Sequence, residues 1–137
     1  MVIGIIGSMH FTEKMVEVSQ ELTRLGHKPV LSGFINDFVG KNNQEKERVK
    51  IEQKFNENAM KRDWERLKNV EALLIINLER HGISNYIGGN TLFELAAGYF
   101  ADKKIFFYNN IPDISYYKSE LQAINPIIIK GDLSKVL

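Results

Sequence analysis

Two acidic side chains interrupt apolar helical patterns in this chain, and both are candidates for chemistry. Glu94 stands within residues 88–101, a run that opens Gly-Gly-Asn-Thr and is otherwise largely apolar. An ionised carboxylate is rarely buried unless it is paired or has a chemical role. Because a glycine-rich loop precedes it, we expect Glu94 in the first turn of a helix, where the dipole and free N–H groups favour negative charge. There it could remain an ionised nucleophile in a dry pocket.

Asp63 is the second acid. It follows Ile51, Phe55 and Ala59 and precedes Leu67 in a row with a spacing of four residues. This spacing predicts that Asp63 lies on the core-facing side of an amphipathic helix and looks toward the sheet. Two acids at one pocket allow a division of roles, in which one is the nucleophile and the other orients it or handles a proton.

Both acids also have a purely structural interpretation. Thr91 and Glu94 have the spacing of a capping box, in which Glu94 would satisfy an N–H group at the helix start. Asp63 is close in sequence to Arg62 and Arg66, and an exposed pair of this kind contributes roughly a few tenths of a kcal/mol. The local patterns leave both alternatives open.

The loop after the first apolar run is a candidate phosphate site, because backbone N–H groups and a hydroxyl stand at the start of a helix. Its residues are Gly7, Ser8, Met9 and His10. A plain tight turn is the alternative, and a lone loop histidine is more often incidental than functional. The chain has neither a full Gly-x-Gly-x-x-Gly fingerprint nor a P-loop motif, which argues against an ATPase or a kinase.

Two aromatic side chains are further candidates. Trp64 and Tyr86 could stack on a nucleobase, although large aromatic residues near a helix face more often belong to the core.

Short apolar runs alternate with helical patterns along the chain. Strands are predicted over residues 2–6, 28–31, 72–77, 104–108 and 127–129, and helices over residues 12–25, 42–69 with a break near 56–58, 91–101 and 115–123. Residues 32–40 are expected to form a loop with apolar contacts. This alternation predicts a single doubly wound α/β domain with a five-stranded parallel sheet, of the Rossmann/flavodoxin-like type. A ligand is then expected where the loops after the first, third and fourth strands meet.

Composition narrows the classes of function. The 137 residues, 44% of them hydrophobic, suit one domain spanning residues 1–137. With 18 basic and 17 acidic residues, net charge points to neither a nucleic-acid polymer nor an anionic membrane, so a small ligand is expected. The chain has no cysteine and three scattered histidines, so no metal site is expected. No apolar run has the length of a signal peptide or membrane span, and we expect a cytoplasmic protein.

The order of these features resembles the nucleoside 2-deoxyribosyltransferase-like superfamily, which includes deoxynucleoside 5'-monophosphate N-glycosidases. The resemblance covers nearly the whole chain and is carried by Gly7-Ser8, by Asp63, by Glu71 before an apolar strand, and by the run from Gly88 to Tyr99, which holds Glu94. The Lys-Lys-Ile-Phe-Phe-Tyr run of residues 103–108 is similar to the Gly-Lys-Pro strand of that group.

The resemblance implies cleavage or transfer of the N-glycosidic bond of a nucleoside or its 5'-monophosphate, without a cofactor. It gives Glu94 the role of nucleophile on the anomeric carbon and Asp63 that of its partner in orientation and proton handling. The sugar or its 5'-phosphate would be held by two glycine-rich loops: Gly7, Ser8, Met9 and His10, with Gly88, Gly89, Asn90 and Thr91. A homo-oligomer is also implied, and the apolar residues Leu92, Phe93, Tyr99 and Phe100 agree with it.

Other assignments stay open. Family transferases often carry Asp or Ser near the position of Gly88, so the choice of substrate is not fixed. The loop also resembles the Pro-Gly-Gly-x-Gly-Thr-x-x-Glu motif of lysine-decarboxylase-like phosphoribohydrolases, but Ile87 and Asn90 stand where that motif has a Pro and a further Gly. The alternative to an enzyme is a nucleotide-binding or sensing module without turnover.

Overall fold

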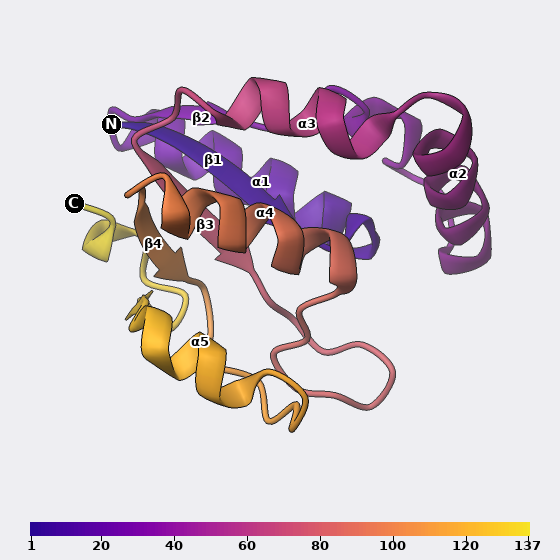
Figure 1. Cartoon of the computed structure of the whole chain (residues 1–137). Helices are drawn as coiled ribbons and strands as arrows, with labels where there is room; N and C mark the ends of the chain where they lie inside the picture. Colours follow the sequence, from indigo (N-terminus) through magenta and orange to yellow (C-terminus); the bar gives the residue numbers. More distant parts are fainter.

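Five parallel strands form the centre of the computed structural model, which describes residues 1–137 (Figure 1). The strands are β1 (Val2–Gly7), β2 (Lys28–Val30), β3 (Ala72–Ile76), β4 (Lys104–Phe107) and β5 (Ile127–Ile128). They lie in the order β2-β1-β3-β4-β5, and every neighbouring pair is parallel. The predicted five-stranded doubly wound sheet is therefore confirmed.

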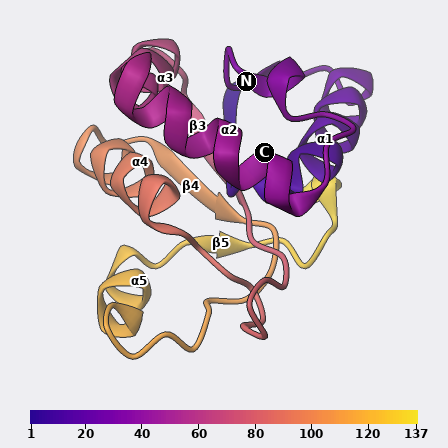
Figure 2. The same ribbon diagram turned by 90° about the vertical axis from the view of Figure 1, so that its right-hand side faces the viewer.

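Helices cover both faces of the sheet, as the apolar central strands β1 and β3 require. On one face lies α1 (Thr12–Arg24), and on the other lie α3 (Ala59–Leu67), α4 (Gly89–Phe100) and α5 (Lys118–Ile124) (Figures 1 and 2). Two separate apolar clusters result, one built around Met15, Val18 and Leu22 of α1 and the other around Leu67, Leu95 and Leu121 of the opposite layer. No helix is both long and apolar enough to cross a membrane.

The helix α2 (Asn43–Asn56) differs from the prediction. Ile51 and Phe55 are 46% and 78% exposed, whereas Lys46 and Gln53 are buried. The chain breaks between α2 and α3 at Asn58, whose φ of 53° is left-handed. Because the break rotates one helix relative to the other, the predicted row from residue 51 to residue 67 does not share one buried face.

Polar contacts attach α2 to the rest of the molecule. The Lys46 amine lies 2.6 Å from a carboxylate oxygen of Glu13 in α1, and the Gln53 amide donates a 2.8 Å hydrogen bond to Asp37. In Figure 1, α2 stands beyond the carboxyl ends of the strands and does not lie on a face of the sheet. This position places α2 beside the loops that follow the strands, where it forms a wall of the candidate site.

The remaining segments agree with the prediction apart from their ends. Residues 32–40 form a loop with one 3₁₀ turn, Ile35–Asp37, and Phe34, Ile35 and Phe38 are buried in it as expected. The last helix begins at Lys118, three residues later than predicted, and α4 begins at Gly89, two residues earlier.

Asn77 joins the two segments that leave β3 and β4. Its side chain is fully buried, and its amide donates to the backbone carbonyls of Asn109 and Asn110 at 3.2 and 2.9 Å. In return, the Asn109 backbone N–H donates to Asn77 Oδ1 at 2.8 Å, and the Asn109 amide donates to the Asn77 carbonyl at 2.9 Å. Four hydrogen bonds thus fix the start of the long loop that leads to α4.

We predict that Asn77→Leu lowers the free energy of unfolding by about 3 kcal/mol, because it leaves buried N–H and carbonyl groups of the β4 segment without partners. Urea denaturation followed by circular dichroism measures this. Asn110→Ala is the matched control, since the Asn110 side chain is exposed and only its backbone carbonyl takes part. Equal stability of the two variants would contradict the assigned role.

Candidate active site

Three hollows meet at the carboxyl ends of β1 and β3, where the strand order reverses. Their walls come from the segments after β1, β2 and β3 and from α2, α3 and α4. The segment after β4 contributes no lining residue to any of them, so the expectation that it would take part was wrong. Its place is taken by Ser32, which comes two residues after the end of β2.

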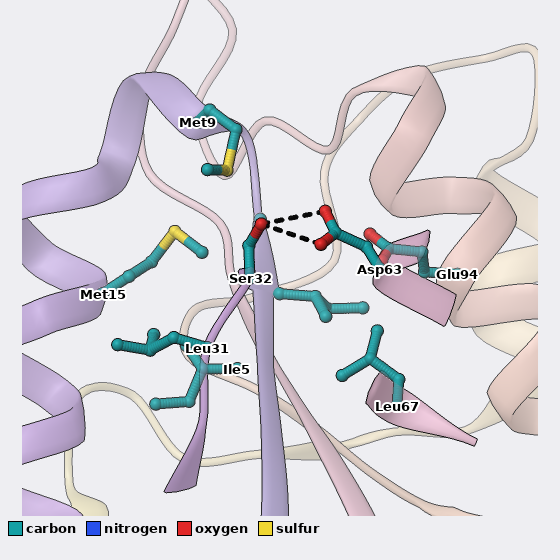
Figure 3. Close-up of a pocket in the computed structure, with 10 residues that line it drawn as sticks. Ile5, Met9, Met15, Leu31, Ser32, Asp63, Leu67 and Glu94 are labelled. Atoms are coloured by element: carbon teal, nitrogen blue, oxygen red, sulfur yellow. Dashed lines mark hydrogen bonds between the residues drawn. The ribbon is translucent and has the colours of Figure 1, made fainter. Parts of the chain in front are cut away.

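Asp63 and Glu94 lie together in the first hollow, an inner cavity of about 20 Å³ between β1 and α4. Figure 3 shows the two carboxyl groups beside one another, with Met9 and Met15 on the far side of the cavity. Asp63 comes from α3 and Glu94 from α4. Helices that pack on the same face of the sheet therefore bring together acids that are 31 residues apart in the chain.

Asp63 is held by a hydroxyl group and not by an arginine. Both of its carboxylate oxygens lie 2.9 Å from Ser32 Oγ, and the hydroxyl accepts a hydrogen bond from the Phe34 N–H (Figure 3). Arg62 and Arg66 make no ion pair with Asp63; Arg66 donates to the Leu31 carbonyl instead. The alternative of a surface Asp–Arg pair is therefore not what the fold contains.

Glu94 has no hydrogen-bond partner at its carboxyl group. It is the sixth residue of α4, in the second turn, and not in the first turn as expected. Thr91 is buried inside the helix and Gly88 occupies the N-cap position without a side-chain hydrogen bond, so the predicted capping box does not form. The carboxyl group of Glu94 points into the hollows and is available to a ligand (Figure 3).

Burial shifts the titration of both acids upward. It raises the pKa of Glu94 to about 8, and the negative charge of Asp63 adds to the shift. The pKa of Asp63 is also raised by burial, against the opposing effects of the Ser32 hydroxyl, the Gly33 N–H and the two nearby arginines. With a pKa of about 8, Glu94 is mostly protonated at neutral pH, whereas the sequence pattern predicts an ionised Glu94.

The second hollow is an apolar pocket of about 270 Å³ between α3 and α4. It opens directly beside the acids, since Asp63 and Glu94 line it too. The aromatic rings of Trp64 and Phe93 form part of its wall, and Phe93 is 68% exposed. Trp64 thus lies where it could contact a flat ligand, as the sequence had suggested.

The third hollow is a larger cleft of about 690 Å³, which we call the basic cleft. One wall is made of residues that the sequence singled out as substrate or phosphate contacts: Gly7, Ser8, Met9, Gly88, Gly89, Asn90 and Thr91. Tyr86 also lines it. The two glycine-rich loops, predicted separately, therefore lie at one place.

His10 is the one predicted contact that does not line any of the three hollows. Its side chain is only 3% exposed, and its ring nitrogens lie 3.3 Å from Asn43 Oδ1 and 2.9 Å from Glu47 Oε2. Both partners belong to α2. The ring therefore attaches that helix to the loop after β1, which is a structural role.

The opposite wall of the basic cleft carries residues that the sequence analysis missed. They are Glu47, Lys50, Lys54, Arg80 and His81. Charged residues cover α2 on several sides, so the sequence alone did not show which of its faces borders the cleft. Ser32 had a clearer signal, because it lies just past the carboxyl end of a parallel strand.

Nowhere in the structure do three or more histidine, aspartate or glutamate side chains gather to hold a metal ion. Glu71, which contributes to the family resemblance, lies at the amino ends of the strands, where it accepts a hydrogen bond from the Val2 N–H at 2.7 Å. No protein-family model, curated protein or solved structure matches this chain.

The raised pKa of Glu94 predicts a specific dependence of stability on pH. Between 4.5, the ordinary pKa, and about 8, the folded protein keeps a proton that the unfolded chain releases. The free energy of unfolding therefore falls as the pH rises through this range. We expect the stability of Glu94→Gln not to decrease in this way. The thermal midpoint of the variant minus that of the wild type should therefore increase from pH 5 to pH 8.

Glu52→Gln is the control, because Glu52 is exposed and makes no ion pair. It should follow the wild-type curve. Parallel curves for Glu94→Gln and the wild type would show that Glu94 titrates normally.

Proposed function

We propose that the protein breaks or exchanges the N-glycosidic bond of a nucleoside or deoxynucleoside, or of its 5'-monophosphate, with Glu94 as nucleophile. The observation that carries the proposal is the meeting of Asp63 and Glu94 at the edge of the sheet, with no hydrogen-bond partner on the Glu94 carboxyl. Packing desolvates the Glu94 carboxyl, and no hydrogen bond offsets this loss, which favours a chemical role for Glu94 over a structural one.

The neighbouring hollows supply room for the other parts of such a substrate. The base would occupy the apolar pocket against Trp64 and Phe93, the sugar would lie over the two acids, and the 5'-phosphate would enter the basic cleft. The N–H groups at the start of α4 favour an anion there. The three hollows share residues where they meet, so one ligand could occupy all of them.

The raised pKa of Glu94 suits this reaction, because a proton on its carboxyl group is available for the departing base. A Glu94 oxygen forms a bond to C1' while the bond from C1' to the base nitrogen breaks, and the positive charge developing on the sugar favours the ionised form of Glu94. The proton of Glu94 passes through Asp63 to the departing base. Water or a second base then attacks C1', releases Glu94 from the glycosyl ester and, by losing a proton to Asp63, restores the pair.

A nucleotide-binding or sensing module without turnover is the second candidate. It is favoured by the pKa of about 8, since Glu94 is mostly protonated at neutral pH before a ligand binds. A phosphoribohydrolase of the lysine-decarboxylase-like type would use the same acids and differ in the sugar and phosphate that it accepts.

The test is the release of free base from a panel of ribo- and deoxyribonucleosides and their 5'-monophosphates, followed by chromatography with and without an acceptor base. We predict release by the wild type, loss of release below detection in Glu94→Gln, and a decrease of about 10²- to 10⁴-fold in Asp63→Asn, because a proton donor and orienting group is removed. Glu52→Gln should retain full activity. No release from any member of the panel would favour the binding module.

The proposal includes a homo-oligomer. Tyr99 and Phe100 of α4 are 41% and 79% exposed, next to the exposed Phe93 at the apolar pocket. Phe93 and Phe100 are about two helical turns apart on one face of α4, and such an exposed apolar face suits a second copy of the chain. We predict that Phe100→Glu shifts the protein toward monomer in sedimentation velocity, since it places a charge on that face, whereas Tyr116→Glu, on an equally exposed aromatic far along the chain, does not. A monomeric wild type would contradict this part.

A further inference from the structure

The basic cleft carries cationic side chains on elements separate from the α4 loop. Lys50 and Lys54 reach it from α2, and Arg80 reaches it from the segment after β3. Glu47 is the only carboxylate among its lining residues. Three permanent cations therefore face one anion on this wall, which leaves an excess of two positive charges.

Glu47 is already engaged by its neighbours. Its carboxylate lies 2.9 Å from His10 Nε2, 2.9 Å from the Lys50 amine and 3.7 Å from the Arg80 guanidinium. Hydrogen bonds from His10 and Lys50 lower the pKa of Glu47 to about 2, so it stays ionised. It fixes the positions of Lys50 and Arg80, while Lys54 makes no hydrogen bond or ion pair.

The two walls of the cleft suit two separate anionic groups. On the first wall, the loops around Gly7 and Gly88 offer backbone N–H groups and a helix start, which bind one phosphate without any side-chain charge. On the second wall, Lys50 and Lys54 are one helical turn apart, about 6 Å along the axis, and Arg80 lies beside them. The surplus of two positive charges on the second wall equals the charge of one terminal phosphate, so each wall suits one phosphate group.

We propose that the substrate of this site is a nucleotide with a diphosphate group, whose second phosphate is held by Lys50, Lys54 and Arg80. The nucleoside part of this assignment rests on the proposed glycosidic function, and the diphosphate part rests on the cleft alone. Arg80 presents a planar fork of donors to a phosphate, and Lys54 supplies a free charge.

Binding of inorganic anions tests the proposal without any turnover. Isothermal titration at constant ionic strength compares orthophosphate with pyrophosphate. The wild type should bind pyrophosphate at least about tenfold more tightly than orthophosphate. Lys54→Gln and Arg80→Gln should each weaken the affinity for pyrophosphate about tenfold, as expected for the loss of one charged contact. The affinity for orthophosphate should change by less than about threefold. Lys28→Gln, which alters an exposed lysine at the far edge of the sheet, should match the wild type.

A second arm uses nucleotides on Glu94→Gln, so that cleavage does not interfere. Adenosine 5'-diphosphate should bind at least about tenfold more tightly than the 5'-monophosphate, and Lys54→Gln in that background should remove the difference. Equal affinity for orthophosphate and pyrophosphate would overturn the proposal. An equal loss of pyrophosphate affinity in Lys28→Gln would also overturn it, since the protein would then attract anions only through its general positive charge.

The two proposals fail in different ways. Pyrophosphate selectivity without base release from any mono- or diphosphate would support the anion site and reject the glycosidic reaction. Base release from monophosphates without pyrophosphate selectivity would overturn the diphosphate assignment and leave the reaction intact.

Discussion

Parallel pairing of β1 with β3 brings their carboxyl ends to one edge of the sheet, and the rest of the site follows from it. Gly7, the last residue of β1, pairs with Ile76, and a Cβ atom at position 7 would approach the Ile76 carbonyl oxygen to 2.6 Å. Only glycine allows this close approach. Since helices cover both faces of the sheet, this edge is where polar loops can meet without disturbing the core.

The same packing desolvates the acids. The helices α3 and α4 bury their apolar sides on one face of the sheet, and Asp63 and Glu94 lie where those sides end. Ser32 donates a hydrogen bond to the Asp63 carboxyl group. The Glu94 carboxyl has no such donor, and desolvation raises its pKa. Glu94 is partly exposed and makes no hydrogen bond at its carboxyl, so the free-energy cost of its desolvation is not offset within the chain.

Most of the sheet and half of the site could be predicted from the sequence. The β3 run is apolar at every position because both sides of a central parallel strand are buried, and such runs are recognisable without tertiary information. The sequence does not predict which turn of its helix holds Glu94. The N-cap residue of α4 is Gly88, which has no side chain to mark the helix start, whereas Thr91 has the residue type and spacing of an N-cap. The cationic wall was missed because α2 is polar on nearly all sides, and only the fold decides which side meets the cleft.

The attachment of α2 has a consequence for the motion of the molecule. Ion pairs and hydrogen bonds such as Lys46 with Glu13 and His10 with Glu47 keep it in place, while Ile51 and Phe55 add little burial. Dissolved ions weaken such attachments far more than they weaken an apolar core. The helix can therefore exchange its amide hydrogens by local opening while the sheet stays folded. The anion proposed for the cleft would bridge α2 to the α4 loop and oppose this opening, so its binding would be thermodynamically linked to the order of the helix.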